Sequence, residues 1–150
     1  MWVCFGNEFK NGTIKGKVYL KKELAVADKL SKCVDINGED FRSMVLESDI
    51  PVMVDFYAQW CGPCRMMSPY LESVASKYDG KIRVVKLNTD DYPRIAMDYD
   101  IRALPTVMVF WAGEIAITMT GMRNEKQLIE AAESVLGKVG RFNSRKEGAD

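Results

Sequence analysis

The stretch VMVDFYAQWCGPC at residues 52–64 joins an apolar run to two closely spaced cysteines. The run Val52–Tyr57 is apolar on both of its alternating faces except at Asp55, which is typical of a central strand buried on both sides of a sheet. A helix is expected after it, because apolar residues recur at helical spacing between Met67 and Tyr78. The cysteine pair is therefore predicted at the turn from a buried strand into a helix.

Strands and helices alternate on both sides of this stretch. In chain order we predict a strand at Cys33–Ile36, a helix capped by Asn37, a strand at Lys81–Leu87, a short helix at Tyr92–Asp98, a hairpin of Thr106–Trp111 and Ile115–Thr120, and a last helix capped by Asn124. Strand–helix alternation followed by a hairpin and a closing helix indicates an α/β sheet that is covered on both faces.

Residues 1–30 differ from the rest of the chain. Aromatic residues and the turn signal Asn11-Gly12 lead into a lysine-rich stretch, and apolar residues between Leu20 and Leu30 suit one face of a short helix. Two interpretations stay open, a docking or targeting segment and a loosely held extension. We expect residues 31–137 to form one domain and residues 138–150 to form a polar C-terminal tail.

The length of 150 residues suits a single domain, and its 21 basic residues are balanced by 21 acidic ones. The absence of net charge argues against nucleic acid and anionic membrane surfaces as partners. No apolar stretch approaches the roughly 18 residues that a membrane span needs. The initial apolar run is too short for a secretory signal, and residues 1–30 are too acidic for a typical transit peptide. A cytoplasmic location is expected, with the plastid stroma or the mitochondrion as the alternative.

The chain contains no histidine, which excludes Ser-His and Cys-His catalytic pairs and every zinc site that uses histidine. A Cys-x-x-Cys pair such as Cys61 and Cys64 occurs in zinc sites, in structural disulfides and in redox couples. Zinc would need Cys4 and Cys33 as further ligands, and these lack the paired spacing of zinc ribbons, so no metal site is expected. A disulfide across a two-residue gap would stabilise the fold only weakly. The position at a helix start favours the redox couple.

The start of a helix suits a reactive cysteine. Unpaired N–H groups and the positive end of the helix dipole are expected to stabilise a thiolate at Cys61. Gly62 lets the chain turn tightly, and Pro63 is tolerated in the first helical turn. Cys64 is expected on the same side, deeper and less exposed. This arrangement suits a two-step exchange in which Cys61 attacks a partner's disulfide and Cys64 then displaces the reduced partner.

The residues VDFYAQWCGPCR at 54–65, followed by Leu104-Pro105-Thr106, resemble the thioredoxin family. The resemblance runs from about Ser31 to Gly137, and the segments SDIPVMVDF and KLNTDDYPRIAMDYDIRALPT look most like its bacterial and plastid m-type branch. It implies a thioredoxin fold with a central mixed β-sheet of about five strands. It also implies a monomeric protein-disulfide reductase with no bound cofactor other than the redox-active disulfide Cys61–Cys64. Such a protein acts on disulfide-containing proteins and is recharged by a thioredoxin reductase that uses NADPH or ferredoxin.

The resemblance assigns roles to further residues. Asp55 matches a buried carboxylate beneath the cysteine pair, and burial raises the pKa of a carboxyl group, so Asp55 is the expected proton acceptor for the Cys64 thiol. Lys86 matches a lysine that tunes this carboxylate. Pro105 matches a cis-proline that faces the disulfide. A flat apolar patch for docking partners would consist of Trp60, Gly62, Pro63, Leu104, Pro105, Gly121 and Met122.

The chain departs from the family pattern in several places. Tyr57 stands where most thioredoxins have a tryptophan, and its hydroxyl is available for an additional hydrogen bond. Trp111-Ala112 replaces more polar residues before the hairpin glycine, and packing of this apolar spot against residues 1–30 is a hypothesis. Cys33 is expected as a small buried hydrophobe, and a regulatory thiol at Cys4 is the less favoured interpretation of that residue.

Two other functions stay open. Oxidising members of the superfamily usually carry a histidine between the cysteines, so Gly62-Pro63 favours a reductase over an isomerase or oxidant. The other alternative is a binding module that uses the apolar patch and does not need the cysteines.

Overall fold

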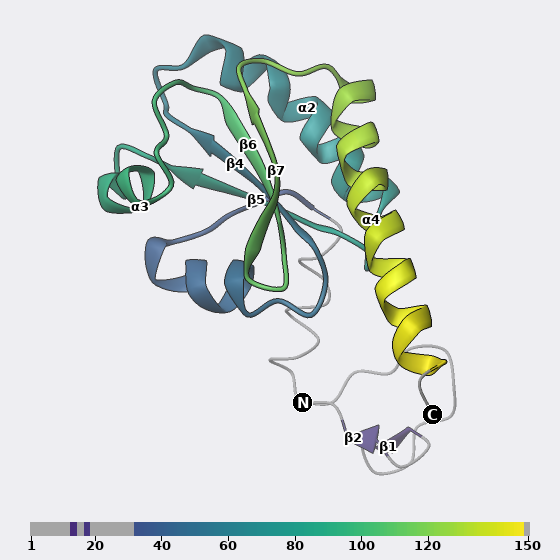
Figure 1. Ribbon diagram of the computed structural model, residues 1–150. Coiled ribbons are helices and arrows are strands. Elements are labelled where there is room, and N and C mark those ends of the chain that lie inside the picture. The colour runs from purple at the N-terminus through teal and green to yellow at the C-terminus, as the bar shows by residue number, and fades with distance from the viewer. Residues whose placement is uncertain (1–12, 15–16, 19–31, 149–150) are drawn as a thin grey trace.

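The computed structural model describes residues 13–14, 17–18 and 32–148 of the chain. Five strands form a central sheet in the order β3-β5-β4-β6-β7 (Figure 1). The elements of this body are β3 (Val34–Asp35), η1 (Gly38–Asp40), η2 (Arg42–Leu46), β4 (Val52–Tyr57), α2 (Gly62–Lys77), β5 (Arg83–Asn88), α3 (Pro93–Asp98), β6 (Thr106–Trp111), β7 (Glu114–Thr120) and α4 (Glu125–Glu147).

The sheet is mixed. Strand β5 pairs in parallel with both β3 and β4, whereas β6 runs antiparallel to β4, and β7 runs antiparallel to β6. Helices α2 and α4 pack on one face, and η2 and α3 pack on the other (Figure 1). The predicted five-stranded mixed sheet with helices on both faces is confirmed.

The alternation of side chains along β4 divides the core into two apolar clusters. Met53 faces α2 and α4, whereas Val52, Val54 and Phe56 face η2 and α3. All four of these residues are fully buried, as the two-sided apolar pattern of the strand predicts. Asp55 lies on the same face as Met53, so its carboxyl group points toward the layer that contains α2.

The predicted helix after Asn37 is wrong in detail. The chain there forms a 3₁₀ turn, η1, followed by a π-helical turn, η2, and Asn37 makes no side-chain capping hydrogen bond. The Oδ1 atom of Asn37 instead accepts a hydrogen bond from the Tyr92 hydroxyl at 3.2 Å. Tyr92, 55 residues away in the sequence, therefore occupies the Asn37 oxygen that the local pattern predicts as the helix cap.

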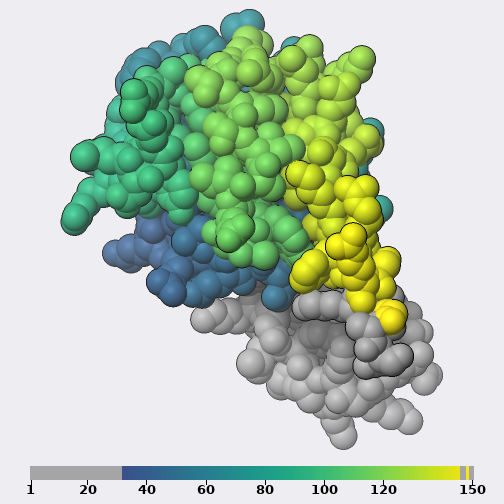
Figure 2. All heavy atoms as spheres, viewed as in Figure 1, coloured from purple at the N-terminus to yellow at the C-terminus, as the bar shows by residue number. Residues whose placement is uncertain are grey.

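The polar C-terminal tail predicted from residue 138 is helical as far as Glu147 in the structure. Asn124 and Gln127 form a reciprocal capping box at the start of α4, as the sequence predicts for Asn124. Val139 packs against the core cluster that α2 and α4 share, which holds the helix beyond Gly137. Its last turns extend past the edge of the sheet (Figure 1), and in the space-filling view their yellow atoms project from the coloured body (Figure 2). None of the described helices combines the length and the apolar character that a membrane span requires.

Within the N-terminal region the structure describes one short ladder, in which β1 (Thr13–Ile14) pairs antiparallel with β2 (Lys17–Val18). The sequence pattern did not predict this pairing. The predicted turn at Asn11-Gly12, the predicted helix between Leu20 and Leu30, and Cys4 lie outside the described residues. The hypothesis that Trp111 packs against residues 1–30 falls there too, and among the described residues Trp111 packs against the core.

The turn of the β6–β7 hairpin holds an alanine in an unfavourable conformation. Ala112 and Gly113 have φ angles of 53° and 80°, which is the left-handed region that a two-residue hairpin turn needs. A residue with a Cβ atom is disfavoured there by roughly 1–2 kcal/mol. Glycine adopts this conformation freely but loses more entropy on folding.

We therefore expect Ala112→Gly to raise the free energy of unfolding by about 0.5–1 kcal/mol, the balance of these two effects. Urea denaturation followed by circular dichroism measures it. The matched control is Ala96→Gly in α3, where the backbone is helical and the same change should lower stability by about 0.5–1 kcal/mol. Destabilisation by both substitutions would contradict the prediction.

Candidate active site

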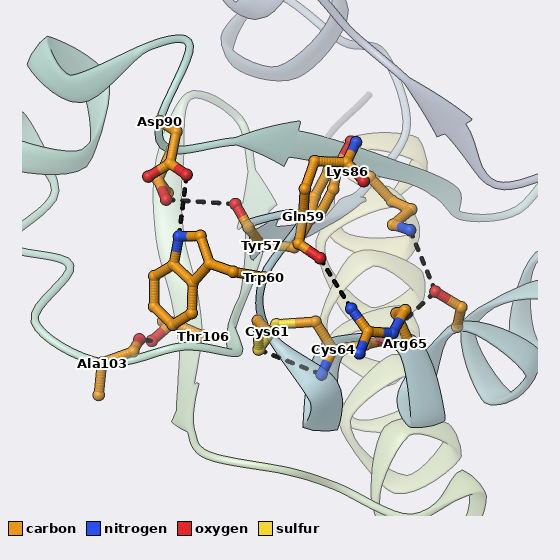
Figure 3. Close-up of a disulfide and its surroundings, with 12 residues drawn as sticks. Tyr57, Gln59, Trp60, Cys61, Cys64, Arg65, Lys86, Asp90, Ala103 and Thr106 are labelled. Atoms are coloured by element: carbon orange, nitrogen blue, oxygen red, sulfur yellow. Dashed lines mark hydrogen bonds between the residues drawn. A yellow bond between two sulfur atoms is a disulfide. The ribbon is translucent and has the colours of Figure 1, made fainter.

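The cysteine pair lies at the junction of β4 and α2. Cys61 is the N-cap of α2, and Gly62 and Pro63 form its first turn. The backbone N–H of Cys64 donates a hydrogen bond to the Sγ atom of Cys61 at 3.2 Å (Figure 3). The two cysteines form a disulfide, with their Cα atoms 5.3 Å apart. The predicted strand–turn–helix placement of the pair is therefore present.

Both cysteines are almost completely buried, with 3% of Cys61 and 2% of Cys64 exposed. The sequence predicts that Cys64 is less exposed than Cys61, and in the structure the two exposed fractions are almost equal. A reacting partner must therefore approach the disulfide through the residues that surround it.

Trp60, which directly precedes Cys61, exposes a large apolar side chain. Its side chain is 69% exposed, and its indole N–H donates a hydrogen bond to Oδ2 of Asp90 at 2.9 Å (Figure 3). This bond fixes the orientation of a ring that projects into solvent. Asp90 was not singled out in the sequence, because nothing local connects it to a residue 30 positions away.

The other residues of the predicted patch differ in exposure. Pro63 and Met122 are exposed, whereas Gly62, Leu104 and Gly121 are half-buried. Pro105 is buried, so its ring adds little to the surface, contrary to the sequence-based description of the patch. The Leu104–Pro105 peptide bond is cis. The carbonyl of Pro105 accepts a hydrogen bond from the N–H of Gly121 at 2.8 Å, which joins two segments of the predicted patch.

A groove of about 270 Å³ lies between Trp60 and α3 and was not foreseen from the sequence. The residues that line it are Trp60, Thr89, Pro93, Ala96, Ile101, Arg102, Ala103 and Leu104. Met97, on the same helix as Ala96, is 79% exposed. The signal available in the sequence is the high proportion of apolar residues between Pro93 and Leu104.

Asp55 is the single charged side chain among the fully buried residues that the structure describes. Neither of its carboxylate oxygens has a hydrogen-bond partner among the described residues. Burial raises the pKa of this carboxyl group from 3.8 to about 7, while the positive charge of Lys86 opposes the rise and the negative charge of Asp35 adds to it. Asp55 is thus a weak acid whose proton can leave or return near neutral pH.

Lys86 lies beside Asp55 in the register of β4 and β5. Its Nζ atom donates a hydrogen bond to Ser68 Oγ in α2 at 3.0 Å and lies 4.4 Å from the centre of the Tyr57 ring (Figure 3). None of the ion pairs between described residues includes Lys86. The ammonium group therefore acts on Asp55 through its electric field.

Cys33 is half-buried and not bonded to another cysteine. Burial raises the pKa of its thiol, and the nearby carboxylate of Glu72 adds to the rise. Its thiol packs against the core cluster under α2 and α4, in agreement with the interpretation as a small hydrophobe. In the part of the chain that the structure describes, no group of three or more potential ligands could hold a metal ion.

Comparison with known proteins assigns the fold to a family. The thioredoxin family model matches residues 32–134, which include both cysteines and the cis-proline. The chain belongs to the thioredoxin family. It is 42% identical over 107 residues to thioredoxin 1 of Nostoc sp., covering 71% of this chain and all of that protein. It is also 43% identical over 101 residues to the chloroplastic M-type thioredoxin of Chlamydomonas reinhardtii, covering 67% of this chain and 72% of the relative.

A third relative is the chloroplastic M-type thioredoxin of Spinacia oleracea, which is 45% identical over 102 residues, or 68% of this chain and 56% of the relative. Thioredoxins are protein-disulfide oxidoreductases that exchange a dithiol for a disulfide, and the Cys61–Cys64 pair fits that reaction. The family uses no cofactor beyond this disulfide and works with disulfide-containing proteins and thioredoxin reductases.

The buried carboxyl group of Asp55 makes the stability of this protein depend on pH. Because the pKa of Asp55 is raised from 3.8 to about 7, the folded protein keeps a proton that the unfolded chain releases between these values. The contribution of Asp55 to stability is therefore fully present below the lower value and is lost as the pH rises through the upper one.

We expect Asp55→Asn to raise the free energy of unfolding of the oxidised protein at pH 8 by up to about 4 kcal/mol, at about 1.4 kcal/mol per pKa unit. At pH 4 the same substitution should change it little, because this pH is close to the unfolded-state pKa of 3.8 and ionisation has hardly begun to favour the unfolded chain. Urea denaturation at the two pH values tests this. Asp98→Asn, at an exposed site, is the control and should change stability little at either pH. An equal effect of Asp55→Asn at both pH values would contradict the raised pKa.

Proposed function

We propose that this member of the thioredoxin family is a general protein-disulfide reductase in which Cys61 is the nucleophile and Cys64 is the resolving cysteine. The observation that carries this assignment is the hydrogen bond from the Cys64 N–H to Cys61 Sγ at the start of α2. In the reduced protein the same N–H and the helix dipole stabilise negative charge on Cys61. Cys64 has no equivalent position, because it lies inside the helix.

The exchange proceeds in two steps. The Cys61 thiolate attacks one sulfur of the partner's disulfide, forms a mixed disulfide and releases the other sulfur as a thiolate, which takes a proton. The Cys64 thiol then loses its proton, and its thiolate attacks Cys61 Sγ. This attack forms the Cys61–Cys64 disulfide and releases the partner's second thiolate. The partner's second thiolate takes a proton, so that two electrons and two protons in all pass to the partner, and a thioredoxin reductase then supplies two new electrons that reduce the Cys61–Cys64 disulfide.

Asp55 is the proposed acceptor of the Cys64 proton. A general base works best when its pKa is near the pH of the reaction, and the pKa of about 7 for Asp55 supports this role. The absence of hydrogen-bond partners for its oxygens among the described residues leaves both able to accept a proton. Lys86 is the proposed tuning residue, since its positive charge limits the rise in the pKa of Asp55.

Partners are proposed to dock on the surface around the disulfide. Trp60, Gly62, Pro63, Leu104, Gly121 and Met122 form this docking surface, and the groove between Trp60 and α3 extends it. The buried cis-Pro105 contributes by placing the backbone of Leu104 where an extended segment of a partner can pair with it. Backbone pairing and apolar contact read little sequence, which suits a protein that reduces many partners.

Further details rest on the family resemblance. Residues 31–137 are proposed to carry the activity as a monomer, with residues 1–30 as a separate extension. The reductase that recharges it uses NADPH or ferredoxin. The bacterial and chloroplastic relatives support a cytoplasmic or plastid-stromal location.

Replacing the resolving cysteine should trap partners. In Cys64→Ser, Cys61 still attacks a disulfide but the mixed disulfide cannot be resolved, so covalent complexes should accumulate in a cell lysate and be released by dithiothreitol. Non-reducing electrophoresis measures them. Cys61→Ser is the matched control and should trap nothing. If the Cys61→Ser, Cys64→Ser double variant kept the full function of the protein in cells, the protein would be a binding module and not a reductase.

Removing the proposed proton acceptor should slow reduction. We expect the Asp55→Asn variant to react with a disulfide-containing protein at pH 8 at a rate at least about tenfold below that of the wild type. General bases contribute about 10²–10⁴ to reaction rates. The increase in the wild-type rate as Asp55 loses its proton near pH 7 should be absent from the variant. Pre-steady-state kinetics with the fully reduced protein measures both effects. An unchanged pH–rate profile would remove Asp55 from the mechanism.

A further inference from the structure

Three charged residues lie side by side across the sheet near the cysteine pair. The parallel register pairs Asp35 of β3 with Lys86 of β5, and Lys86 with Asp55 of β4. Register partners in neighbouring strands point to the same face. Lys86 therefore lies between two acidic residues in the sheet, the exposed Asp35 and the fully buried Asp55.

Tyr57 contacts two of these three residues. It follows Asp55 by two positions in β4 and so lies on the same face of the sheet. Its hydroxyl donates a hydrogen bond to Asp35 Oδ1 at 2.6 Å, and Lys86 Nζ lies 4.4 Å from the centre of its ring (Figure 3). A tryptophan here, as the sequence resemblance leads one to expect, has no hydroxyl to offer Asp35.

Asp35 is hydrogen-bonded to Tyr57 and forms no ion pair with its register partner Lys86. Asp35 is a register partner of Lys86, so a carboxylate not held by Tyr57 is within reach of the ammonium group. In the structure these two groups form no ion pair, and Lys86 binds Ser68 and the Tyr57 ring instead. The Tyr57 hydroxyl holds Asp35 in one place, and the Tyr57 ring holds Lys86 in another.

We propose that Tyr57 is a positioning residue that keeps the Lys86 ammonium group beside Asp55 by holding the competing carboxylate of Asp35. The effect of this arrangement on disulfide exchange rests on the proposed role of Asp55 as proton acceptor. The placement of the charge does not depend on that role.

The two cysteines near Asp55 carry no charge near pH 7 in the oxidised protein. Cys33, which precedes β3, is a thiol with a raised pKa and is neutral near pH 7. In α2, Cys64 is in the disulfide of the oxidised protein and does not titrate. Among the described residues, the charges that act on Asp55 are thus those of Lys86 and Asp35.

The proposal predicts a specific pattern among variants. Tyr57→Phe keeps the ring and releases Asp35, which then draws Lys86 outward, so the Asp55 carboxyl group should titrate about half a pH unit higher. Asp35→Asn removes a negative charge near Asp55 and should shift its titration downward. In Tyr57→Phe, Asp35→Asn no carboxylate competes for Lys86, so the upward shift should disappear.

Carbon-13 NMR of the aspartate carboxyl groups in the full-length oxidised protein measures these midpoints between pH 5 and 9. The Asp55 signal is assigned by its absence from Asp55→Asn. Circular dichroism establishes that each variant is folded. Tyr70→Phe, at a half-buried tyrosine of α2 that packs against the core, is the matched control and should leave the Asp55 midpoint unchanged.

An upward shift in Tyr57→Phe that is lost in the double variant supports the proposal. The absence of a shift, or a shift of equal size with and without Asp35, overturns it, because the hydroxyl then acts only through packing. The pH–rate profile tests the proposed function separately. If the carboxyl midpoint moves and the rate profile does not, the positioning role of Tyr57 stands and the proton-transfer role of Asp55 fails. If the rate profile follows the titration of Asp55 and no variant shifts its midpoint, the proton-transfer role of Asp55 stands and the positioning role of Tyr57 fails.

Discussion

The buried carboxyl group of Asp55 is the constraint on which the rest of this structure depends. Taking a carboxylate out of water without hydrogen-bond partners is unfavourable, and the fold tolerates it because two well-packed apolar clusters surround the sheet. Burial of Asp55 therefore lowers the stability of the fold near and above neutral pH. It also gives the protein a carboxyl group with a pKa near 7 on the face of the sheet that α2 covers, and the cysteines lie at the start of that helix.

Much of the fold could be predicted because its signals are local. The two-sided apolar pattern of Val52–Tyr57, the hairpin turn at Ala112-Gly113 and the cap at Asn124 are each specified by adjacent residues. The cap at Asn37 is equally clear in the sequence and wrong, because Tyr92 competes for the same oxygen. The length of α4 was underestimated because its continuation looks polar, and the packing of Val139 is a tertiary contact.

The candidate site shows the same division. The cysteines, Asp55 and Pro105 were found from motif spacing and family resemblance. The hydrogen bonds of Trp60 to Asp90 and of Tyr57 to Asp35 join residues that are 30 and 22 positions apart, and no local pattern predicts either bond. These two hydrogen bonds hold the side chains of Trp60 and Tyr57 in place beside the motif. Sequence therefore gives the chemistry of the site, and the structure gives its orientation and its charge balance.

The almost complete burial of both cysteines has a consequence for how electrons are distributed in a cell. A small thiol needs direct access to a sulfur atom to react with a disulfide, and here the surrounding side chains leave almost none. A protein partner that covers the docking surface brings its own sulfur to the disulfide as part of binding. Small thiols are therefore expected to react with this disulfide more slowly than a docked protein partner does, so that access, as well as potential, determines where its electrons go.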